Sequence, residues 1–136
     1  MVYLDYAATT PYHKEVLKTY TQLLEKYFYN ADSIYSQGIE VNRLLEKSRS
    51  LLAKMLNVSD EEMIFTSCGS EANNMAIKGI AFQYQNRGKH IITTSIEHSS
   101  VYETCKELEE VFGYEVTYLP VDHTGHIQIE DVKKSI

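Results

Sequence analysis

A glycine and a serine stand at the start of a predicted helix, in the stretch "FTSCGSEANN" of residues 65–74. The first turn of a helix leaves backbone N–H groups without partners, and the helix dipole favours an anion there. Gly69 lets the backbone approach a ligand closely, and Ser70 adds a hydroxyl donor. The stretch therefore predicts a phosphate-binding turn, although a serine that only caps the helix fits the spacing equally well.

The phosphate predicted at this turn does not belong to a common nucleotide. The sequence contains no G-x-G-x-x-G fingerprint, and "RGKH" at residues 87–90 lacks the leading glycine and the hydroxyl residue of a Walker loop. A ligand other than ATP or NAD is therefore expected.

A histidine follows the next predicted strand, in "HIITTSIEHSSV" at residues 90–101. The imidazole of His98 could stack on a flat heteroaromatic ring or act as an acid or base near neutral pH. The alternative is a surface histidine that caps the following helix beside Ser99 and Ser100. Because the carboxyl ends of parallel strands share one sheet edge, His98 is expected near the turn at Gly69 and Ser70.

Four further side chains are weaker candidates. Cys68 precedes a helix, where thiolate is favoured, but no base is adjacent in sequence, so we expect a packed small residue. Cys105 falls on an apolar helical stripe and is expected in the core. His123 and His126 flank a glycine turn with no third ligand evident, so no metal site is predicted.

The elements that position these residues alternate along the chain. From about residue 62 the order is strand, helix, strand, helix, strand, with short connections, which favours parallel pairing and an α/β class. The hydrophobic periodicity predicts helices at about 11–28, 39–56, 70–85 and 99–112 and from about 129, and strands at about 62–67, 89–95 and 114–120.

Composition narrows the class of protein. The chain has 136 residues, a net charge of −6 and a pI near 5.3, without a basic face, which argues against binding to nucleic acid. The sequence offers no apolar run of membrane-spanning length and no secretory signal pattern at its start. Two cysteines form no disulfide framework, so a reduced cytoplasmic protein is expected.

Four collinear segments carry a resemblance to a family. They are "YLDYAATTP" at 3–11, "FTSCGSEANNMAIKG" at 65–79, "GKHIITTSIEHSSV" at 88–101 and "YEVTYLPVDHTGHI" at 114–127. In order and separation they resemble the N-terminal portion of the class V aminotransferase group, specifically cysteine desulfurases of the NifS/IscS type. These are homodimeric enzymes with the fold-type-I pyridoxal-phosphate architecture, so the resemblance implies an α/β fold with a mostly parallel sheet flanked by helices.

The resemblance also implies roles for individual residues. The cofactor phosphate would be held at the turn of Gly69 and Ser70, and His98 would stack over the pyridine ring and assist proton transfer. Residues 1–14 would lie near the substrate site, and residues 15–136 would begin the large cofactor-binding domain. The reaction would convert L-cysteine to L-alanine and pass the sulfur to an enzyme cysteine, and a sulfur-acceptor protein would be a partner.

The family pattern is altered at a few positions. Within "YNADSIYSQG" at 29–38, Ala31, Asp32 and Tyr35 replace the usual proline, serine and histidine. Cys68 replaces a usual glycine, while Ser70 keeps the hydroxyl of the more frequent threonine. These differences bear on substrate choice rather than on fold.

The family's Schiff-base lysine, its aspartate partner of the pyridinium nitrogen and its sulfur-accepting cysteine lie beyond the length of this chain. We therefore expect an N-terminal fragment that is inactive by itself and that self-associates through uncovered apolar surface and an open sheet edge. Two alternatives stay open. The parent could be another class V enzyme, such as a selenocysteine lyase or a small-molecule aminotransferase, or the chain could be a non-catalytic module that binds a phosphorylated ligand.

Overall fold

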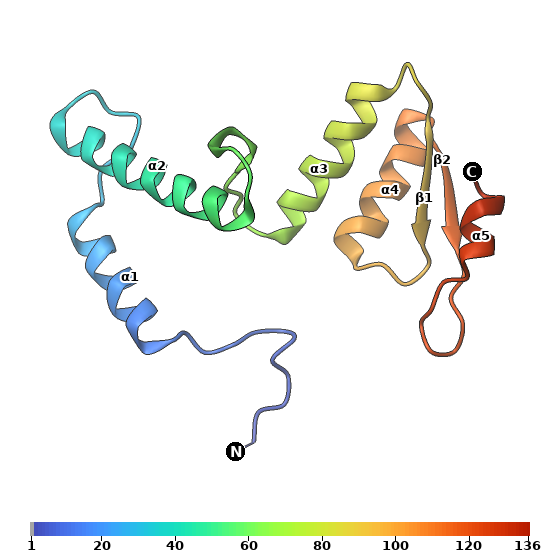
Figure 1. Ribbon diagram of the computed structural model, residues 1–136, viewed down its shortest axis with the longest axis horizontal. Coiled ribbons are helices and arrows are strands. Elements are labelled where there is room, and N and C mark those ends of the chain that lie inside the picture. Colours follow the sequence, from blue (N-terminus) through green and yellow to red (C-terminus); the bar gives the residue numbers. More distant parts are fainter. Residues whose placement is uncertain (1) are drawn as a thin grey trace. The chain divides into compact units, whose positions relative to one another are not determined.

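The computed structural model describes residues 2–136, which form two compact units, one that ends at Ile64 and one that begins at Phe65 (Figure 1). The first unit contains α1 (Lys14–Lys26), α2 (Ser36–Leu56) and the short 3₁₀ helix η1 (Asp60–Glu62). The second contains α3 (Gly69–Tyr84), β1 (His90–Thr94), α4 (Ser99–Phe112), β2 (Glu115–Leu119) and α5 (Ile129–Lys134). None of the helices in this described range is long and apolar enough to cross a membrane.

A close backbone approach fixes the start of α2. A Cβ atom on Gly38 would lie 2.6 Å from the carbonyl oxygen of Ser33 and 2.7 Å from that of Asn30. Only glycine fits where these carbonyls press against the first turn of the helix. The hydroxyl of Tyr27 also donates to the Glu40 carboxylate at 3.2 Å, which links the end of α1 to α2.

The end of α2 is equally specific. Asn57 takes the left-handed conformation at φ 56°, and the N–H of Val58 donates to the carbonyl of Ala53 at 3.0 Å. This is the usual way in which a helix end satisfies its last carbonyls. The Ser59 and Glu62 side chains then form a capping box at the start of η1.

The predicted strand at 62–67 is wrong. Residues 60–62 form η1, and residues 63–66 belong to no helix and pair with no strand in the described part of the chain. A strand needs a neighbour for its N–H and C=O groups. Here the carbonyl of Met63 instead accepts a hydrogen bond from the guanidinium of Arg49 on α2.

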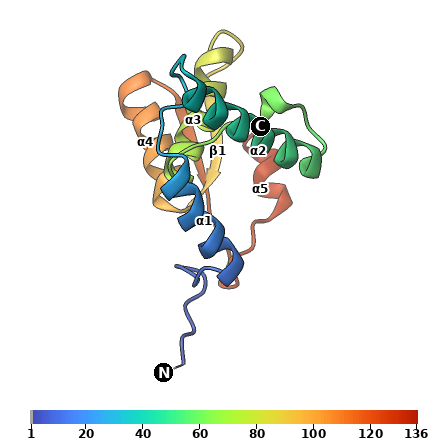
Figure 2. The ribbon, with the colours of Figure 1, turned by 90° about the vertical axis from the view of Figure 1, so that its left-hand side faces the viewer.

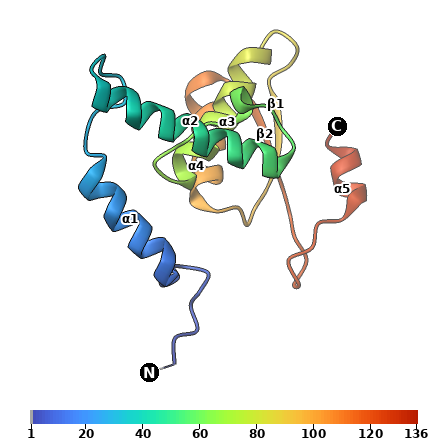
Figure 3. The ribbon, with the colours of Figure 1, turned by 60° about the vertical axis from the view of Figure 1, so that its left-hand side comes forward.

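The second unit is built on a parallel pair of strands. β1 and β2 run in register from His90 opposite Glu115 to Thr94 opposite Leu119, and α4 forms the crossover between them. Helices α3 and α4 lie on one side of the two strands, and α5 lies on the other (Figures 2 and 3). The α/β class with parallel pairing is thus confirmed, with two strands in place of the three that were predicted.

One face of α4 supplies most of the core of this unit. Its buried residues are Ser100, Thr104, Cys105 and Leu108, spaced so that they share one side of the helix. They pack with the buried residues Tyr114, Val116 and Leu119. Leu108 is completely buried and Cys105 is 2% exposed, so the prediction of a core position for Cys105 is confirmed.

Contacts along their length hold α3 beside α4. Near the carboxyl ends the rings of Phe82 and Phe112 meet edge to face at 5.0 Å between centroids. In the middle, Lys78 and Glu107 form an ion pair of 2.7 Å. The hydroxyl of Tyr114 also donates to the carbonyl of Ala81 at 2.6 Å, which ties α3 to the segment that enters β2.

The predicted helix boundaries hold closely in this unit. The helix predicted at 99–112 is found at those residues, because His98 caps its start and Gly113, at φ 68°, ends it. In the first unit, by contrast, the helix predicted at 11–28 is shorter, since regular hydrogen bonding begins only after His13 and ends at Lys26. The division of the chain at residue 14 by function stays a prediction.

Truncation of Leu108 tests this description of the core. Leu108→Ala is expected to lower the free energy of unfolding by about 3 kcal/mol, because it opens a cavity at a fully buried position. The control is Val111→Ala on the same helix, at a side chain that is 69% exposed, where the change should stay within about 0.5 kcal/mol. Urea denaturation followed by circular dichroism measures both, and equal losses would contradict the assigned core.

Candidate phosphate turn and histidine site

The start of α3 leaves backbone donors free. Cys68 is the N-cap residue, and the N–H of Ala72 donates to its carbonyl at 3.1 Å as the first helical hydrogen bond. The N–H groups of Gly69, Ser70 and Glu71 find no backbone acceptor among residues 2–136. Together with the helix dipole, these three groups can receive an anion.

The space above this turn is open. A Cβ atom on Gly69 would meet no other atom within 4 Å. The side chain of Ser70 is exposed, and its hydroxyl forms no hydrogen bond with any residue that the structure describes. The donor set is therefore accessible and has the composition that a phosphate group needs.

The acidic residue in this turn has a separate function. The carboxylate of Glu71 accepts a hydrogen bond of 2.5 Å from the N–H of Ser67 and one of 2.7 Å from its hydroxyl. These two donors, the N–H first, lower the pKa of Glu71. Glu71 therefore stays ionised and fixes the loop that enters the helix.

Cys68 lies on the surface, so the expectation of a packed residue is wrong. The N-cap position places this side chain at the exposed end of the helix. The pKa of the thiol is lowered by the N–H of Glu71, the hydroxyl of Ser67 and the N–H of Ser70, although the sulfur closes no regular capping hydrogen bond.

His98 is the N-cap residue of α4. Its Nδ1 atom accepts a hydrogen bond of 3.2 Å from the N–H of Ser100 and lies 2.9 Å from the hydroxyl oxygen of the same residue. The ring is exposed, and its Nε2 atom has no hydrogen-bond partner within the described residues. The capping role that the sequence suggested as an alternative is real, and it leaves the outer edge of the ring available for a ligand.

A side-chain hydrogen bond brings the two helix starts together. The amide nitrogen of Asn73, in the second turn of α3, donates to the hydroxyl oxygen of Ser100 at 2.8 Å. Ser100 in turn contacts His98. The expected proximity of the phosphate turn and His98 therefore rests on this contact between helices, because the strand predicted before α3 does not form.

Sequence reasoning did not identify Asn73 as part of this site, and it considered Ser100 only as a capping residue. Both stand close to predicted site residues, since Asn73 follows Ser70 by three positions and Ser100 follows His98 by two. Polar residues at such positions are common at helix ends, so only the packing of α3 against α4 identifies them.

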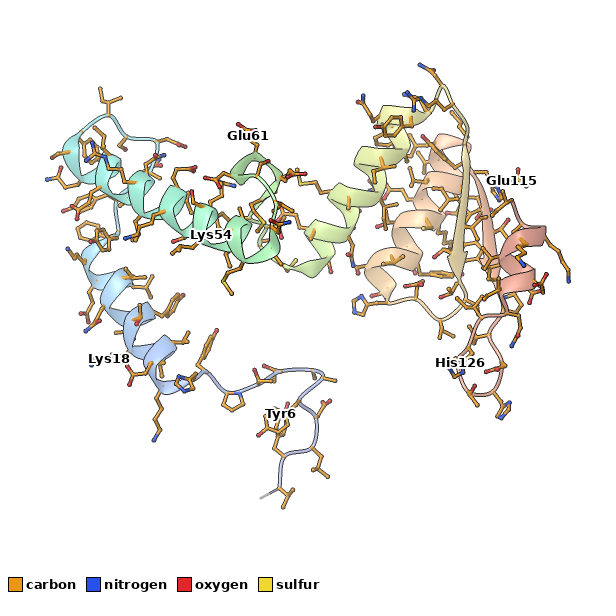
Figure 4. All side chains as sticks on the ribbon, in the orientation of Figure 1. Tyr6, Lys18, Lys54, Glu61, Glu115 and His126 are labelled. Carbon is orange, nitrogen blue, oxygen red and sulfur yellow. The ribbon has the colours of Figure 1, made fainter. Side chains whose placement is uncertain are left out.

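Two other titratable side chains beyond the strand ends, Glu97 and His126, belong to no cluster of metal-binding residues in the described part of the chain. The carboxylate of Glu97 accepts a hydrogen bond of 2.8 Å from the Thr94 hydroxyl at the end of β1. His126 lies in the loop between β2 and α5, where its Nδ1 atom is 2.6 Å from the hydroxyl of Thr124 (Figure 4). Across residues 2–136 no three side chains of the metal-binding kinds gather at one place.

Three of the altered positions, Ala31, Asp32 and Tyr35, lie in the first unit. Asn30 forms a turn with its side chain, because its side-chain oxygen Oδ1 accepts a hydrogen bond of 2.9 Å from the backbone N–H of Asp32. Tyr35 meets the ring of Tyr29 edge to face at 6.2 Å between centroids. Ala31 is half-buried within the same loop.

The two cysteines should differ in reactivity. At neutral pH, iodoacetamide is expected to modify Cys68 at least about tenfold faster than Cys105, because Cys68 is exposed with a lowered pKa while burial raises the pKa of Cys105. Since the thiolate reacts, alkylation of Cys68 should set in at a lower pH than for an ordinary thiol, and Ser67→Ala should shift this onset upward.

Mass spectrometry of the two cysteine-containing peptides measures these alkylation rates. Protein unfolded in urea is the control, because both thiols should then react alike. Equal rates in the folded protein would contradict the assigned environments.

The comparison with known families gives one match over almost the whole chain. The sequence pattern of the family described as aminotransferase class-V matches residues 2–136. A cysteine desulfurase IscS of Dictyoglomus turgidum is 48% identical over 135 residues, which cover 99% of this chain and 34% of that protein. A cysteine desulfurase IscS of Clostridium botulinum is 44% identical with the same coverage.

Solved structures agree with this match. A structure titled "NIFS-LIKE PROTEIN" is 39% identical with a TM-score of 0.86, over 95% of this chain and 35% of the other. A structure titled "SspA in complex with cysteine" is 36% identical with a TM-score of 0.86, over 98% of this chain and 38% of the other. The chain spans about a third of the length of the curated relatives that it matches, and on these grounds it belongs to the aminotransferase class-V family.

Proposed function

We propose that this chain is the N-terminal third of a pyridoxal-phosphate-dependent cysteine desulfurase and that it supplies part of the cofactor site. The observation that carries the proposal is the open helix start at Gly69 and Ser70, linked through Asn73 and Ser100 to the exposed ring of His98. The curated relatives named cysteine desulfurase support the choice of reaction.

The phosphate of the cofactor fits the donors at the start of α3. The N–H groups of Gly69, Ser70 and Glu71, which have no backbone acceptor among the described residues, and the hydroxyl of Ser70 would be the donors to an anion, and no Cβ obstructs its approach over Gly69. Because Glu71 is held by Ser67, its carboxylate is not an internal substitute for the phosphate.

The ring of the cofactor would lie against His98. Pyridoxal phosphate supplies an electron sink for chemistry at the carbon atoms of an amino acid. The imidazole of His98 would stack on the ring from one side and hold a proton at its outer nitrogen, where the described residues leave room for a ligand. Its other nitrogen is engaged with Ser100 and cannot serve the substrate.

L-cysteine is the substrate that the relatives favour, and the neighbour structure titled "SspA in complex with cysteine" binds it. Residues 2–14 would contribute to the substrate site of the whole enzyme, and a protein that accepts sulfur would be its partner. A selenocysteine lyase or a small-molecule aminotransferase of the same family is the second candidate, because the phosphate turn and His98 would serve those reactions as well. The cytoplasm fits all of these enzymes.

Binding of the cofactor tests the phosphate turn directly. The isolated chain is expected to bind pyridoxal phosphate weakly and reversibly, and Ser70→Ala should weaken binding about tenfold, because a hydrogen bond to a charged group is lost. Ser36→Ala, at an exposed serine in the first turn of α2, is the matched control and should bind like the unaltered chain.

A titration followed by pyridoxal-phosphate absorbance gives these affinities, and pyridoxal without the phosphate serves as a second ligand. Equal affinity for pyridoxal phosphate and pyridoxal would contradict the assignment of a phosphate site. A stable covalent adduct between the cofactor and a lysine of this chain would also contradict the assignment.

The isolated chain is also expected to form dimers or larger oligomers. Many large apolar side chains are exposed, among them Ile80 and Phe112 in the second unit, and each of the two strands has one unpaired edge. Sedimentation at micromolar concentration measures the mass, and adding salt should not dissociate the oligomer, since apolar contacts hold it. A uniform monomer would contradict this expectation and weaken the proposal of a homodimeric enzyme.

The gene tests the catalytic part of the proposal. A reading frame that continues past the codon for Ile136 into a lysine preceded by histidine, and then into a cysteine-bearing loop, would support a desulfurase. A stop codon directly after Ile136 would contradict the catalytic proposal and favour a module that binds a phosphorylated ligand at Gly69 and Ser70.

A further inference from the structure

We propose that Asn73 and Ser100 are positioning residues that fix both the orientation and the tautomer of His98, so that the neutral ring carries its proton on the outer nitrogen, Nε2. The role assigned to that proton rests on the function proposed above. The hydrogen-bond chain itself does not, because it is formed by described residues of this chain alone.

The direction of the hydrogen bonds follows from one donor whose identity is fixed. The backbone N–H of Ser100 can only donate, and it points to Nδ1 of His98 at 3.2 Å, so Nδ1 is an acceptor without a proton. The Ser100 hydroxyl, 2.9 Å from the same atom, then donates to it as well. Its oxygen remains free to accept the amide N–H of Asn73 at 2.8 Å.

The opposite arrangement fails at one contact. If the side-chain amide of Asn73 were turned by 180°, its oxygen would accept the Ser100 hydroxyl, and the hydroxyl oxygen would then need a proton from Nδ1. That proton would lie opposite the backbone N–H of Ser100, so that two donors would face each other with no acceptor. One arrangement therefore satisfies all three contacts, and it places the ring proton on Nε2.

The hydrogen bonds from Asn73 to His98 are held in place because Ser100, which stands between them, is buried. Ser100 is 9% exposed, and its carbonyl accepts a hydrogen bond of 2.7 Å from the hydroxyl of Thr104, which is 2% exposed. Such packing limits the rotamers available to the Ser100 side chain. The ring of His98 is thereby fixed to the body of α4 at one edge, while its other edge faces outward.

This arrangement determines what His98 can do toward a ligand. A neutral imidazole with its proton on Nε2 is a hydrogen-bond donor at its outer edge and cannot take up a proton there. His98 would thus enter the reaction as a hydrogen-bond donor at its outer edge rather than as a base. Because Asn73 is on the helix that begins with the phosphate turn, the same hydrogen bonds also keep the ring in register with that turn.

Nitrogen NMR of the imidazole rings tests the proposal on this chain without any cofactor. The chain is labelled with ¹⁵N-histidine and studied in alkaline solution, at about pH 9, so that the rings are neutral and the Nε2–H to Nδ1–H ratio is read directly. A His98→Gln variant identifies the signals of His98 among those of the five histidines.

Two variants change the hydrogen bonds in different ways. Asn73→Asp keeps the shape but turns a donor into an acceptor that draws away the Ser100 hydroxyl proton, and Ser100→Ala removes that hydroxyl. Each should lower the Nε2–H to Nδ1–H ratio of His98 about fivefold, which corresponds to one hydrogen bond of about 1 kcal/mol. Ser99→Ala is the matched control, because Ser99 is the exposed neighbouring serine and should leave the ratio unchanged.

The outcomes separate this proposal from the proposed function. An unchanged ratio in a folded Asn73→Asp variant overturns the positioning role, whether or not Ser100→Ala folds. The same samples are then titrated with pyridoxal phosphate. A ratio that falls in both variants, in a chain that does not bind the cofactor, supports the positioning role and overturns the cofactor site. Binding of the cofactor with unchanged ratios supports the cofactor site and overturns the positioning role.

Discussion

Two parallel strands can be joined only by a crossover that returns along the whole sheet, and in this protein that crossover is α4. The helix buries one face, with Leu108 and Cys105 at its centre, against the strands, and it packs beside α3. Because both helices are fixed by this contact, their first turns are fixed as well. The position of the start of α3 relative to His98 is therefore a consequence of core packing rather than of any local motif.

The two helix starts have the same physical problem and solve it differently. Each leaves backbone N–H groups without helical partners. At α4, His98 satisfies one of them with its own ring and thereby fixes itself. At α3 the N-cap residue Cys68 closes no regular capping hydrogen bond, and the donors above Gly69 stay accessible. One start thus positions a side chain, and the other offers a site to an anion.

Cys68 gives this site a property that a glycine there would lack. The N–H groups that could receive a phosphate also stabilise a thiolate at the sulfur, which lowers the pKa of Cys68. Cys105 shows the opposite effect, since burial disfavours its charged form and raises its pKa. A phosphate bound at Gly69 and Ser70 would lie close to this thiolate and would repel it.

Features that depend on neighbouring residues could be predicted from the sequence: the helix at 99–112 between its cap and Gly113, the parallel strands around it, the Gly-Ser turn and the family to which the four segments belong. Other features follow only from contacts between distant parts of the chain. The segment at 62–67 forms no strand, because no partner strand lies beside it and Arg49 binds its backbone. The exposure of Cys68 depends on which elements cover the start of α3. The link from Asn73 to Ser100 joins residues 27 positions apart, and only the packing of one helix against the other brings their side chains within hydrogen-bonding distance.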